Sequence, residues 1–358
     1  MRAVIALPLL LWLSVFVLAV LGGHSADKGL SLLFLTDFNV HGRLLFALPL
    51  MLLAEMMTER FMEPASSRLQ ALIPEASQRR FLDIDLSMQG LRQSRWPEIM
   101  LIVFVYFIGI GLVWRALSVL DVGSWYRPAA GETWSLSMAG YWYVLVSLPV
   151  FQFVLCRWYV RLFLWLHFLW QVSGIPMTLQ PSHPDRRGGL GFLSTAVKGF
   201  TALAAAHGAM LSGHLATEVL MLGHSLFDYK AVILAMVVLV LAITLGPLLV
   251  LSPQLMRAKR AGLATYGLLA SRYIALFDAK WLGSETAAKS DQLLGATDIQ
   301  SLADLGSSYD MVKAMRPTPI SKEDLISFSA ITLLPLLPLL LAALPLEQIV
   351  KGLMGVLF

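Results

Sequence analysis

The sequence predicts an all-helical (all-α) protein that crosses a membrane about seven times. Of its 358 residues, 57% are hydrophobic and 14% are charged, and the mean hydropathy is +0.71. Soluble domains carry roughly 25% charged residues, and a single core grows too slowly with chain length to bury this apolar surplus. The one cysteine, Cys156, excludes an intramolecular disulfide and any zinc or iron–sulfur site built from several cysteines.

Apolar runs in the first third of the chain predict three spans. Residues 3–23 form an uncharged run, longer than the 7 to 15 or so apolar residues of a secretory signal, so we interpret it as a retained first span. Residues 44–57 predict a second span, although Glu55 interrupts it. Residues 99–114 predict a third.

The fourth predicted span is longer than a bilayer requires. It occupies residues 138–156 and continues without a helix breaker through Arg157 and Arg161 to about residue 172. At about 1.5 Å per residue the whole helix reaches about 50 Å, against about 30 Å for the hydrocarbon core. We therefore expect this helix to project from the membrane.

Three more spans are predicted at residues 199–222, 231–251 and 325–344. Between the last two, apolar side chains at helical spacing predict an amphipathic helix that continues out of the sixth span. Capping boxes predict where two later helices begin, one at Thr297 with Gln300 and one at Ser321 with Asp324.

The charge distribution predicts the orientation. With the N-terminus inside and the C-terminus outside, the inner segments hold 21 of the 27 Lys and Arg residues, as the positive-inside rule requires. The predicted division is transmembrane helices 1 and 2 (1–57), a cytoplasmic loop (58–98), transmembrane helices 3 and 4 with a cytoplasmic extension (99–172), a cytoplasmic Gly/Arg loop (173–198), transmembrane helices 5 and 6 (199–252), a cytoplasmic helical segment (253–324), and transmembrane helix 7 with a C-terminal amphipathic segment (325–358).

The stretch "QPSHPDRRGGLGF" lies at the predicted inner end of the fifth span. We predict a binding site for an anion or a lipid phosphate here. It would be formed by the free N–H groups of the next helix and by Arg186, Arg187, Gly188 and Gly189. In the alternative reading Asp185 caps the helix, the arginines set the topology, and the glycines allow tight packing.

His207, His214 and Glu218 fall within an arc of about 40° on one face of the fifth span. Polar groups at that depth are costly, so this face is expected to look into the protein and contact water or an ion path. Interhelical hydrogen bonding and a metal or haem site are the alternatives. No HExxH motif or second ligand helix accompanies the stripe, so we predict no metal site and no cofactor.

Two other features are candidates for an ion path. Glu55, Glu59 and Glu63 form an acidic stripe that predicts an inner vestibule, unless it only pairs with Arg60, Arg157 and Arg161. In the last span, Ser329 and Thr332 lie close to three prolines, and carbonyls freed by the prolines line a cavity or bond to neighbouring helices. The apolar middle of this span suits a dewetting gate or an ordinary lipid-facing helix.

The quoted loop, with "LASRYIALFDAKWL" and "TDIQSLADLG", resembles uncharacterised families of polytopic bacterial inner-membrane proteins. The resemblance implies a multi-pass protein of the cell inner membrane and carries no activity, ligand or catalytic residue. By topology alone the chain is also similar to seven-transmembrane ion channels of the insect chemoreceptor type. That likeness implies four subunits joined by cytoplasmic helices, with the seventh helices lining a cation pore. The chain ends on "LEQIVKGLMGVLF" and lacks the aromatic signature that ends those channels.

Three functions follow as hypotheses. The first is a homo-oligomeric ion channel whose partners are the lipid bilayer, ions and further copies of the chain. The second is a membrane metal or redox enzyme subunit using His207, His214 and Glu218, and the third is a non-catalytic subunit or sensor. We favour a non-enzymatic role, because no nucleotide-binding fingerprint is present, and we expect no nucleic acid among the partners. Residues 266–281 and 299–315 are predicted to form an assembly surface or to fold back on the fourth helix.

Overall fold

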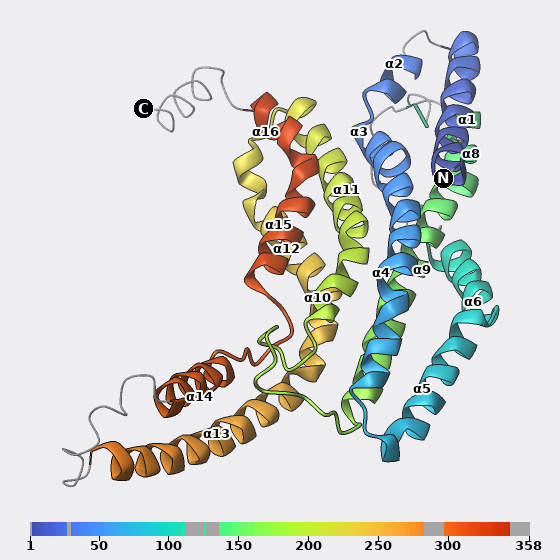
Figure 1. Cartoon of the computed structure of the whole chain (residues 1–358). Coiled ribbons are helices and arrows are strands. Elements are labelled where there is room, and N and C mark those ends of the chain that lie inside the picture. Colours follow the sequence, from blue (N-terminus) through green and yellow to red (C-terminus); the bar gives the residue numbers. More distant parts are fainter. Residues whose placement is uncertain are drawn as a thin grey trace, which may run out of the picture.

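The computed structural model describes residues 2–26, 30–109, 111, 125–126, 136–282 and 297–343. Every regular element within these ranges is a helix of the α, 3-10 or π type (Figure 1), which confirms the all-helical part of the predicted fold class. The first half contains α1 (Arg2–Ala26), α2 (Leu30–Leu35), α3 (Phe38–His41), η1 (Gly42–Ala47), α4 (Leu48–Ala71), α5 (Glu75–Gln93), α6 (Trp96–Phe104), η2 (Val105–Gly109), α8 (Met138–Trp142), η3 (Tyr143–Ser147) and α9 (Leu148–Ser173). The second half contains α10 (Phe192–Ala196), η4 (Val197–Phe200), α11 (Thr201–Leu220), η5 (Leu226–Tyr229), α12 (Lys230–Thr244), η6 (Gly246–Leu251), α13 (Ser252–Trp281), α14 (Thr297–Lys313), α15 (Lys322–Leu333), η8 (Leu334–Leu336) and α16 (Leu337–Ala343).

Five continuous helices in the described chain are long and apolar enough to cross a membrane. They are Val4–Leu21, Phe38–Ala71, Met138–Ser173, Leu226–Thr244 and Lys322–Ala342. They correspond to the predicted first, second, fourth, sixth and seventh spans. The third of them has 36 residues, so the expectation of an over-long fourth helix is confirmed.

The two remaining predicted spans differ from these five. The apolar helix Trp96–Gly109 is shorter, and residues 110 and 112–114 of the predicted third span lie outside the described residues. The predicted fifth span corresponds to α11, which has 20 residues and is not among the five candidates. Its two histidines and Glu218 lower its hydropathy, while its position among other helices removes the need for an apolar outer surface.

Two π-helical segments are explained by proline. η1 ends two residues before Pro49, and η3 ends two residues before Pro149. Proline cannot donate to the carbonyl four residues earlier and its ring clashes there, so the preceding turn widens. The helices continue past both prolines. η1 therefore forms one long helix with α4, and η3 forms one with α9.

α11 is the central helix of the bundle (Figure 1). It packs against α3, η1 and α4 on one side and against α12, α15 and η8 on the other. Small residues make this possible, because they let helix backbones approach closely. A Cβ on Gly213 would lie 2.6 Å from the carbonyl oxygen of Phe38, and a Cβ on Gly208 would lie 2.0 Å from that of Thr332.

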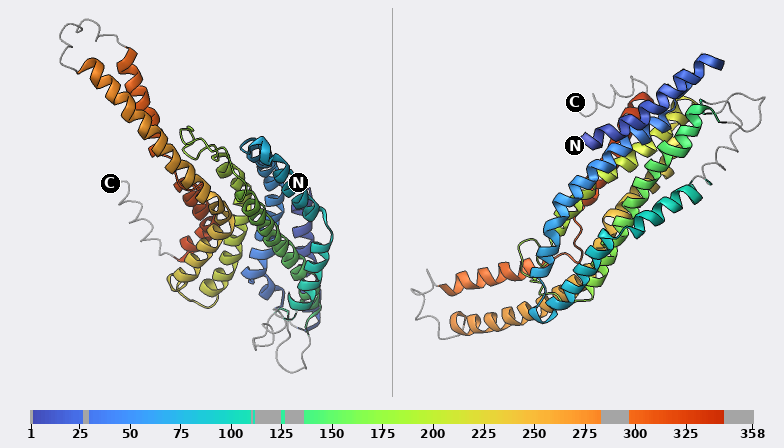
Figure 2. Two further views of the ribbon diagram at one scale, coloured as in Figure 1. Left: turned by 90° about the horizontal axis from the view of Figure 1, so that it is seen from below. Right: turned by 90° about the vertical axis from the view of Figure 1, so that its right-hand side faces the viewer.

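α13 and α14 form a hairpin that projects from one end of the bundle, which we call the hairpin end (Figures 1 and 2). The two helices pack against each other. Tyr273 donates its hydroxyl hydrogen to the carbonyl of Asp298, at 3.0 Å. The outer part of the hairpin therefore does not fold back on α9, which was the sequence-based alternative.

The segment predicted as a loop at residues 58–98 is mostly helical, because α4 runs on to Ala71 and α5 follows almost at once. α5 buries Phe81, Ile84 and Met88, and Phe81 meets Phe168 of α9 edge to face. The predicted start of the last span is confirmed. Ser321 and Asp324 form a reciprocal capping box at the beginning of α15.

Candidate functional site

His207 is buried in the bundle and both of its ring nitrogens have partners. Nδ1 lies 2.9 Å from the carbonyl oxygen of Leu203, which can only accept, so Nδ1 carries the hydrogen. Nε2 of the neutral ring then accepts a hydrogen bond from the hydroxyl of Tyr159 on α9, at 3.0 Å. The predicted interhelical hydrogen bond is therefore present, between α11 and α9.

Glu218 belongs to a different cluster, at the end of the bundle opposite the hairpin. Its carboxylate accepts from the Tyr229 hydroxyl at 2.9 Å and lies 3.0 Å from Nδ1 of His224. These three side chains tie the end of α11 to the short connection that leads into α12. They lie about 16 Å along the helix from His207, at about 1.5 Å per residue.

The expectation that all three stripe residues face the protein interior is wrong for His214. Its side chain is exposed, whereas His207 is buried and Glu218 is partly buried. The neighbouring helices explain the difference. Close packing passes through Gly213 toward α3 and η1 and through Ser212 toward η8, which leaves the side of α11 that carries His214 uncovered.

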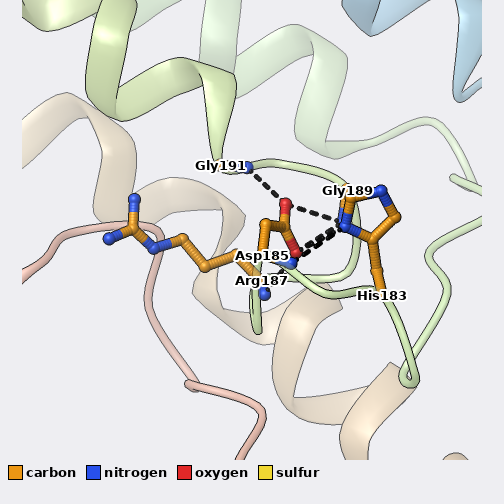
Figure 3. Close-up of polar contacts among 5 residues, drawn as sticks. All are labelled: His183, Asp185, Arg187, Gly189 and Gly191. Carbon is orange, nitrogen blue, oxygen red and sulfur yellow. Dashed lines mark hydrogen bonds and ion pairs between the residues drawn. The ribbon is translucent and has the colours of Figure 1, made fainter. Parts of the chain in front are cut away.

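The "QPSHPDRRGGLGF" loop is organised around the carboxylate of Asp185 (Figure 3). It accepts backbone N–H bonds from Arg187 at 2.7 Å, from Gly189 at 3.1 Å and from Gly191 at 2.8 Å. Nδ1 of His183 lies 2.8 Å from the same group. Gly191 is the residue that precedes α10, and no side chain in the described part of the chain caps the N–H groups of that helix. Asp185 therefore organises the loop through the N–H groups of Arg187, Gly189 and Gly191, but it does not cap α10 as the alternative interpretation expected.

Backbone geometry explains why glycine occurs in this loop. Arg186, Gly188 and Gly189 have positive φ angles of 55°, 64° and 97°. Glycine adopts these values at little cost, while Arg186 is held there by its surroundings. The carbonyl of Arg186 accepts from the backbone N–H of Arg316, at 2.7 Å, which joins the loop to the segment after α14.

The charge of Asp185 is stabilised by its partners. Burial alone would raise the pKa of the carboxyl group, but the N–H bonds from Arg187, Gly191 and Gly189 outweigh it and hold the pKa below its ordinary value. Near this loop, Asp324 of α15 accepts from the hydroxyl of Ser194, at 2.5 Å. The Nε atom of Arg187 is buried and has no hydrogen-bond partner among the described residues.

The acidic stripe on α4 is partly neutralised. Glu55 pairs with Arg157 at 3.1 Å and with Arg161, and Arg157 also lies 3.8 Å from Glu98. Glu59 is exposed, and the side chain of Glu63 lies outside the described residues. The pairing alternative therefore holds for Glu55.

In the last span, Thr332 points into the bundle. It is buried and its hydroxyl donates to the carbonyl of Phe328, while Ser329 is half-buried. The carbonyl of Pro335 accepts from the hydroxyl of Ser212 at 2.7 Å. The sequence predicts that carbonyls freed by the prolines either line a cavity or bond to a neighbouring helix. The Pro335 carbonyl bonds to a neighbouring helix.

Sequence reasoning missed Tyr159, His224, Tyr229 and Ser194, which partner the predicted residues. His224 and Tyr229 lie just beyond Glu218 in the chain, so a search for polar groups after the helix would have found them. Tyr159 and Ser194 come from distant segments. No three His, Cys, Asp or Glu side chains in the described chain are grouped so that they could hold a metal ion. Comparison with protein-family models, curated proteins and solved structures gave no match.

Proposed function

We propose that this chain is a membrane protein that assembles into a homo-oligomeric ion channel, with the hairpin end in the cytoplasm and the ion path between subunits. The observation that carries the proposal is the α13–α14 hairpin, which presents apolar surface beyond the helices that would lie in the bilayer. Surface of this kind outside a membrane is typical of protein interfaces. The long α9 helix and the basic residues near the hairpin support the orientation.

The outer face of α13 suits another helix. Exposed alanines and one leucine recur along it at intervals of three, four or seven residues, at Ala261, Ala264, Leu268, Ala275 and Ala279. Such spacing forms one stripe on a helix and allows close helix packing. The stripe lies on the side of α13 away from α14, because Tyr266, Tyr273 and Phe277 on the other side are half-buried.

Charge complementarity favours another copy of the chain as the partner. Four of the exposed charges of α13 are basic, at Arg257, Arg260, Arg272 and Lys280, and one is acidic, at Asp278. The exposed charges of α14 are Asp304, Asp310 and Lys313, so two of the three are acidic. α13 of one subunit would thus meet α14 of the next, and a head-to-tail interface of this kind forms a ring when the rotation between neighbouring subunits closes.

The last span supports conduction along the ring axis. One exposed stripe of this span carries Glu323, Ser327, Leu334, Leu337 and Leu341. It begins with a carboxylate at the hairpin end and continues with leucines, the arrangement of a cation-attracting mouth followed by an apolar gate. Within one chain, His207 and Glu218 are engaged with internal partners, so a path between subunits fits the geometry better than a path through α11.

Assembly can be tested with charge reversal on the hairpin. Gly262 lies against Val312 and Gly267 against Tyr309, a register that places Arg272 level with Asp304. Arg272→Asp should lower the particle mass measured by light scattering, and the double variant with Asp304→Arg should restore it. Leu268→Glu should also lower it, whereas Ile274→Glu, at an exposed position off the stripe, serves as the control. An unchanged mass in Arg272→Asp and Leu268→Glu would refute assembly through the hairpin.

Conduction can be tested in liposomes that contain the purified protein. If Leu337 lines an apolar gate, Leu337→Asn should increase potassium flux because the gate would hydrate. Leu234→Asn on α12 is the matched control, since Leu234 is also exposed but lies outside the proposed pore. Equal flux in the two variants would contradict the pore.

A second function, as a non-catalytic assembly subunit, is favoured by the same hairpin. An oligomer that moves no ions at any voltage, either as wild type or as Leu337→Asn, would select it. The enzyme hypothesis has less support, because His207 and Glu218 bond to different elements and His214 is exposed.

A further inference from the structure

An apolar groove runs along α6 beside α9. Its lining includes Met100, Leu101, Phe104 and Ile108, which share one face of the α6–η2 helix, together with Val160 of α9. The groove measures about 500 Å³ and is shallow and widely open to its surroundings. Its long axis follows α6, which begins toward the hairpin end of the molecule (Figure 1).

Basic side chains gather where the groove begins. Arg157 lies 3.8 Å from Glu98 at the start of α6, and Arg161 follows one turn later on α9. Arg92 at the end of α5 is close enough to Arg161 to interact with it electrostatically. Glu55 and Glu98 neutralise two of these three positive charges. The exposed Arg95, just before α6, adds a further positive charge.

The start of α6 also carries Trp96, whose side chain is 70% exposed. Tryptophan concentrates at the headgroup level of membranes, where its ring meets both water and hydrocarbon. An exposed tryptophan, a basic cluster and an apolar groove thus follow one another along the direction of the helix. This is the order of headgroup and acyl chain in a lipid of the leaflet at the hairpin end.

We propose that this groove binds one acyl chain of an anionic phospholipid, whose phosphate lies among Arg92, Arg95, Arg157 and Arg161. The proposal rests on the proposed membrane insertion but not on channel activity. The net positive charge at the groove's mouth selects an anionic headgroup, because arginine pairs well with phosphate oxygens. The length of apolar helix beyond the mouth favours a lipid over free phosphate, which would need only the arginines.

The experiment is native mass spectrometry of the purified chain after addition of phosphatidylglycerol or phosphatidylcholine with identical acyl chains. Wild type should retain phosphatidylglycerol preferentially. The double variant Arg92→Gln, Arg95→Gln should lower its affinity by about thirtyfold, which corresponds to about 1 kcal/mol for each of the two arginines. Arg79→Gln with Arg80→Gln, the same charge change elsewhere on α5, should leave the affinity unchanged.

The groove is tested separately from the charge. Val103 lines the groove and is exposed, so Val103→Trp should fill it and displace the lipid without disturbing the core. Ile102→Trp is the matched control, because Ile102 is equally exposed but does not line the groove. Circular dichroism confirms that each variant is folded.

Three outcomes would overturn the proposal: equal retention of the two lipids, equal loss in the Arg79/Arg80 control, or unchanged binding in Val103→Trp. Failure of the proposed channel function would give different results from failure of the lipid site. A chain that is not inserted fractionates away from membranes and retains neither lipid. A chain that binds phosphatidylglycerol as expected but moves no ions leaves the lipid site intact and refutes only the channel.

Discussion

The bundle around α11 and the α13–α14 hairpin are both helical, but they are held together differently. In the bundle, backbones meet directly, as where Gly208 faces the carbonyl of Thr332. In the hairpin, Gly306 has no heavy atom within 4 Å of a Cβ built on it, and Leu276 of α13 is 72% exposed. The bundle therefore covers its central helix on every side but the one that carries His214, whereas the hairpin covers only one side of each of its helices.

Polar groups follow the same contrast. Inside the bundle, His207 has both ring nitrogens bonded and Thr332 returns its hydroxyl to its own helix. On the hairpin, most charged side chains are exposed. A region can therefore be rich in apolar residues for two reasons, either to complete its own fold or to contact another molecule. Substitutions at matched positions distinguish the two.

The largest effect is expected for Gly208→Ala. The added methyl group would lie 2.0 Å from the Thr332 carbonyl oxygen, so α11 and α15 must separate. We expect a loss of about 3 kcal/mol in the free energy of unfolding, measured by denaturant titration in detergent micelles. Retention of wild-type stability would show that the two helices do not pack this closely.

A smaller loss is expected for Asp185→Asn in the loop that joins the two regions. The amide nitrogen cannot accept hydrogen bonds, so some of the N–H groups of Arg187, Gly189 and Gly191 lose their partner. The free energy of unfolding should fall by about 2 kcal/mol. Hydrogen exchange should show faster exchange at these three amides. Unaltered exchange there would contradict the central role of this carboxylate.

The same carboxylate predicts a dependence on pH. Its pKa is lower in the folded chain than in the unfolded chain, so its contribution is fully present above the ordinary aspartate value of about 3.9. That contribution is lost as pH falls from there through the lowered pKa. Wild type should therefore lose more stability than Asp185→Asn when both are acidified from pH 5 to about pH 3. Parallel curves would show that Asp185 titrates normally.

Tyr159→Phe tests the polar link between α9 and α11. The substitution removes the only donor that bonds to Nε2 of His207 among the described contacts, while the ring remains in place. A loss of about 1 kcal/mol in stability is expected. Tyr106→Phe provides a comparison, because the hydroxyl of Tyr106 is in an exposed contact with the carbonyl of Leu145. Equal losses of stability in the two variants would mean that the hydrogen bond to the buried His207 contributes no more to stability than an exposed one.

The smallest effect, and one of opposite sign, is expected for Gly306→Ala in α14. The position is helical and open, so alanine restricts the unfolded chain without a clash and should add about 0.7 kcal/mol of stability. Gly306→Ala and Gly208→Ala are the same substitution, so together they compare the free space around a glycine in α14 with that in α11. Destabilisation at Gly306 would indicate that another chain packs against α14, which would itself support the proposed assembly.

Much of the architecture was predictable from local pattern. Five predicted spans, the over-long helix Met138–Ser173 and the capping box at Ser321 need only residues close together in sequence. The candidate sites were less predictable. The spacing of His207, His214 and Glu218 correctly places them on one helix, but it does not reveal which neighbour covers each residue. The same limit applies to the loop, where the sequence left both an external anion and a cap by Asp185 open.

By itself, the sequence determined the helical class, the apolar rods and their approximate ends, because hydropathy, proline and capping act over a few residues. Tertiary structure decided which polar groups are satisfied and which surfaces are left open. Tyr159 reaches His207 across 48 positions, and Ser194 reaches Asp324 across 130. Such contacts depend on how helices pack, and packing depends on the shapes of several helices at once. That is why the central position of α11 and the uncovered faces of the hairpin emerge only from the folded chain.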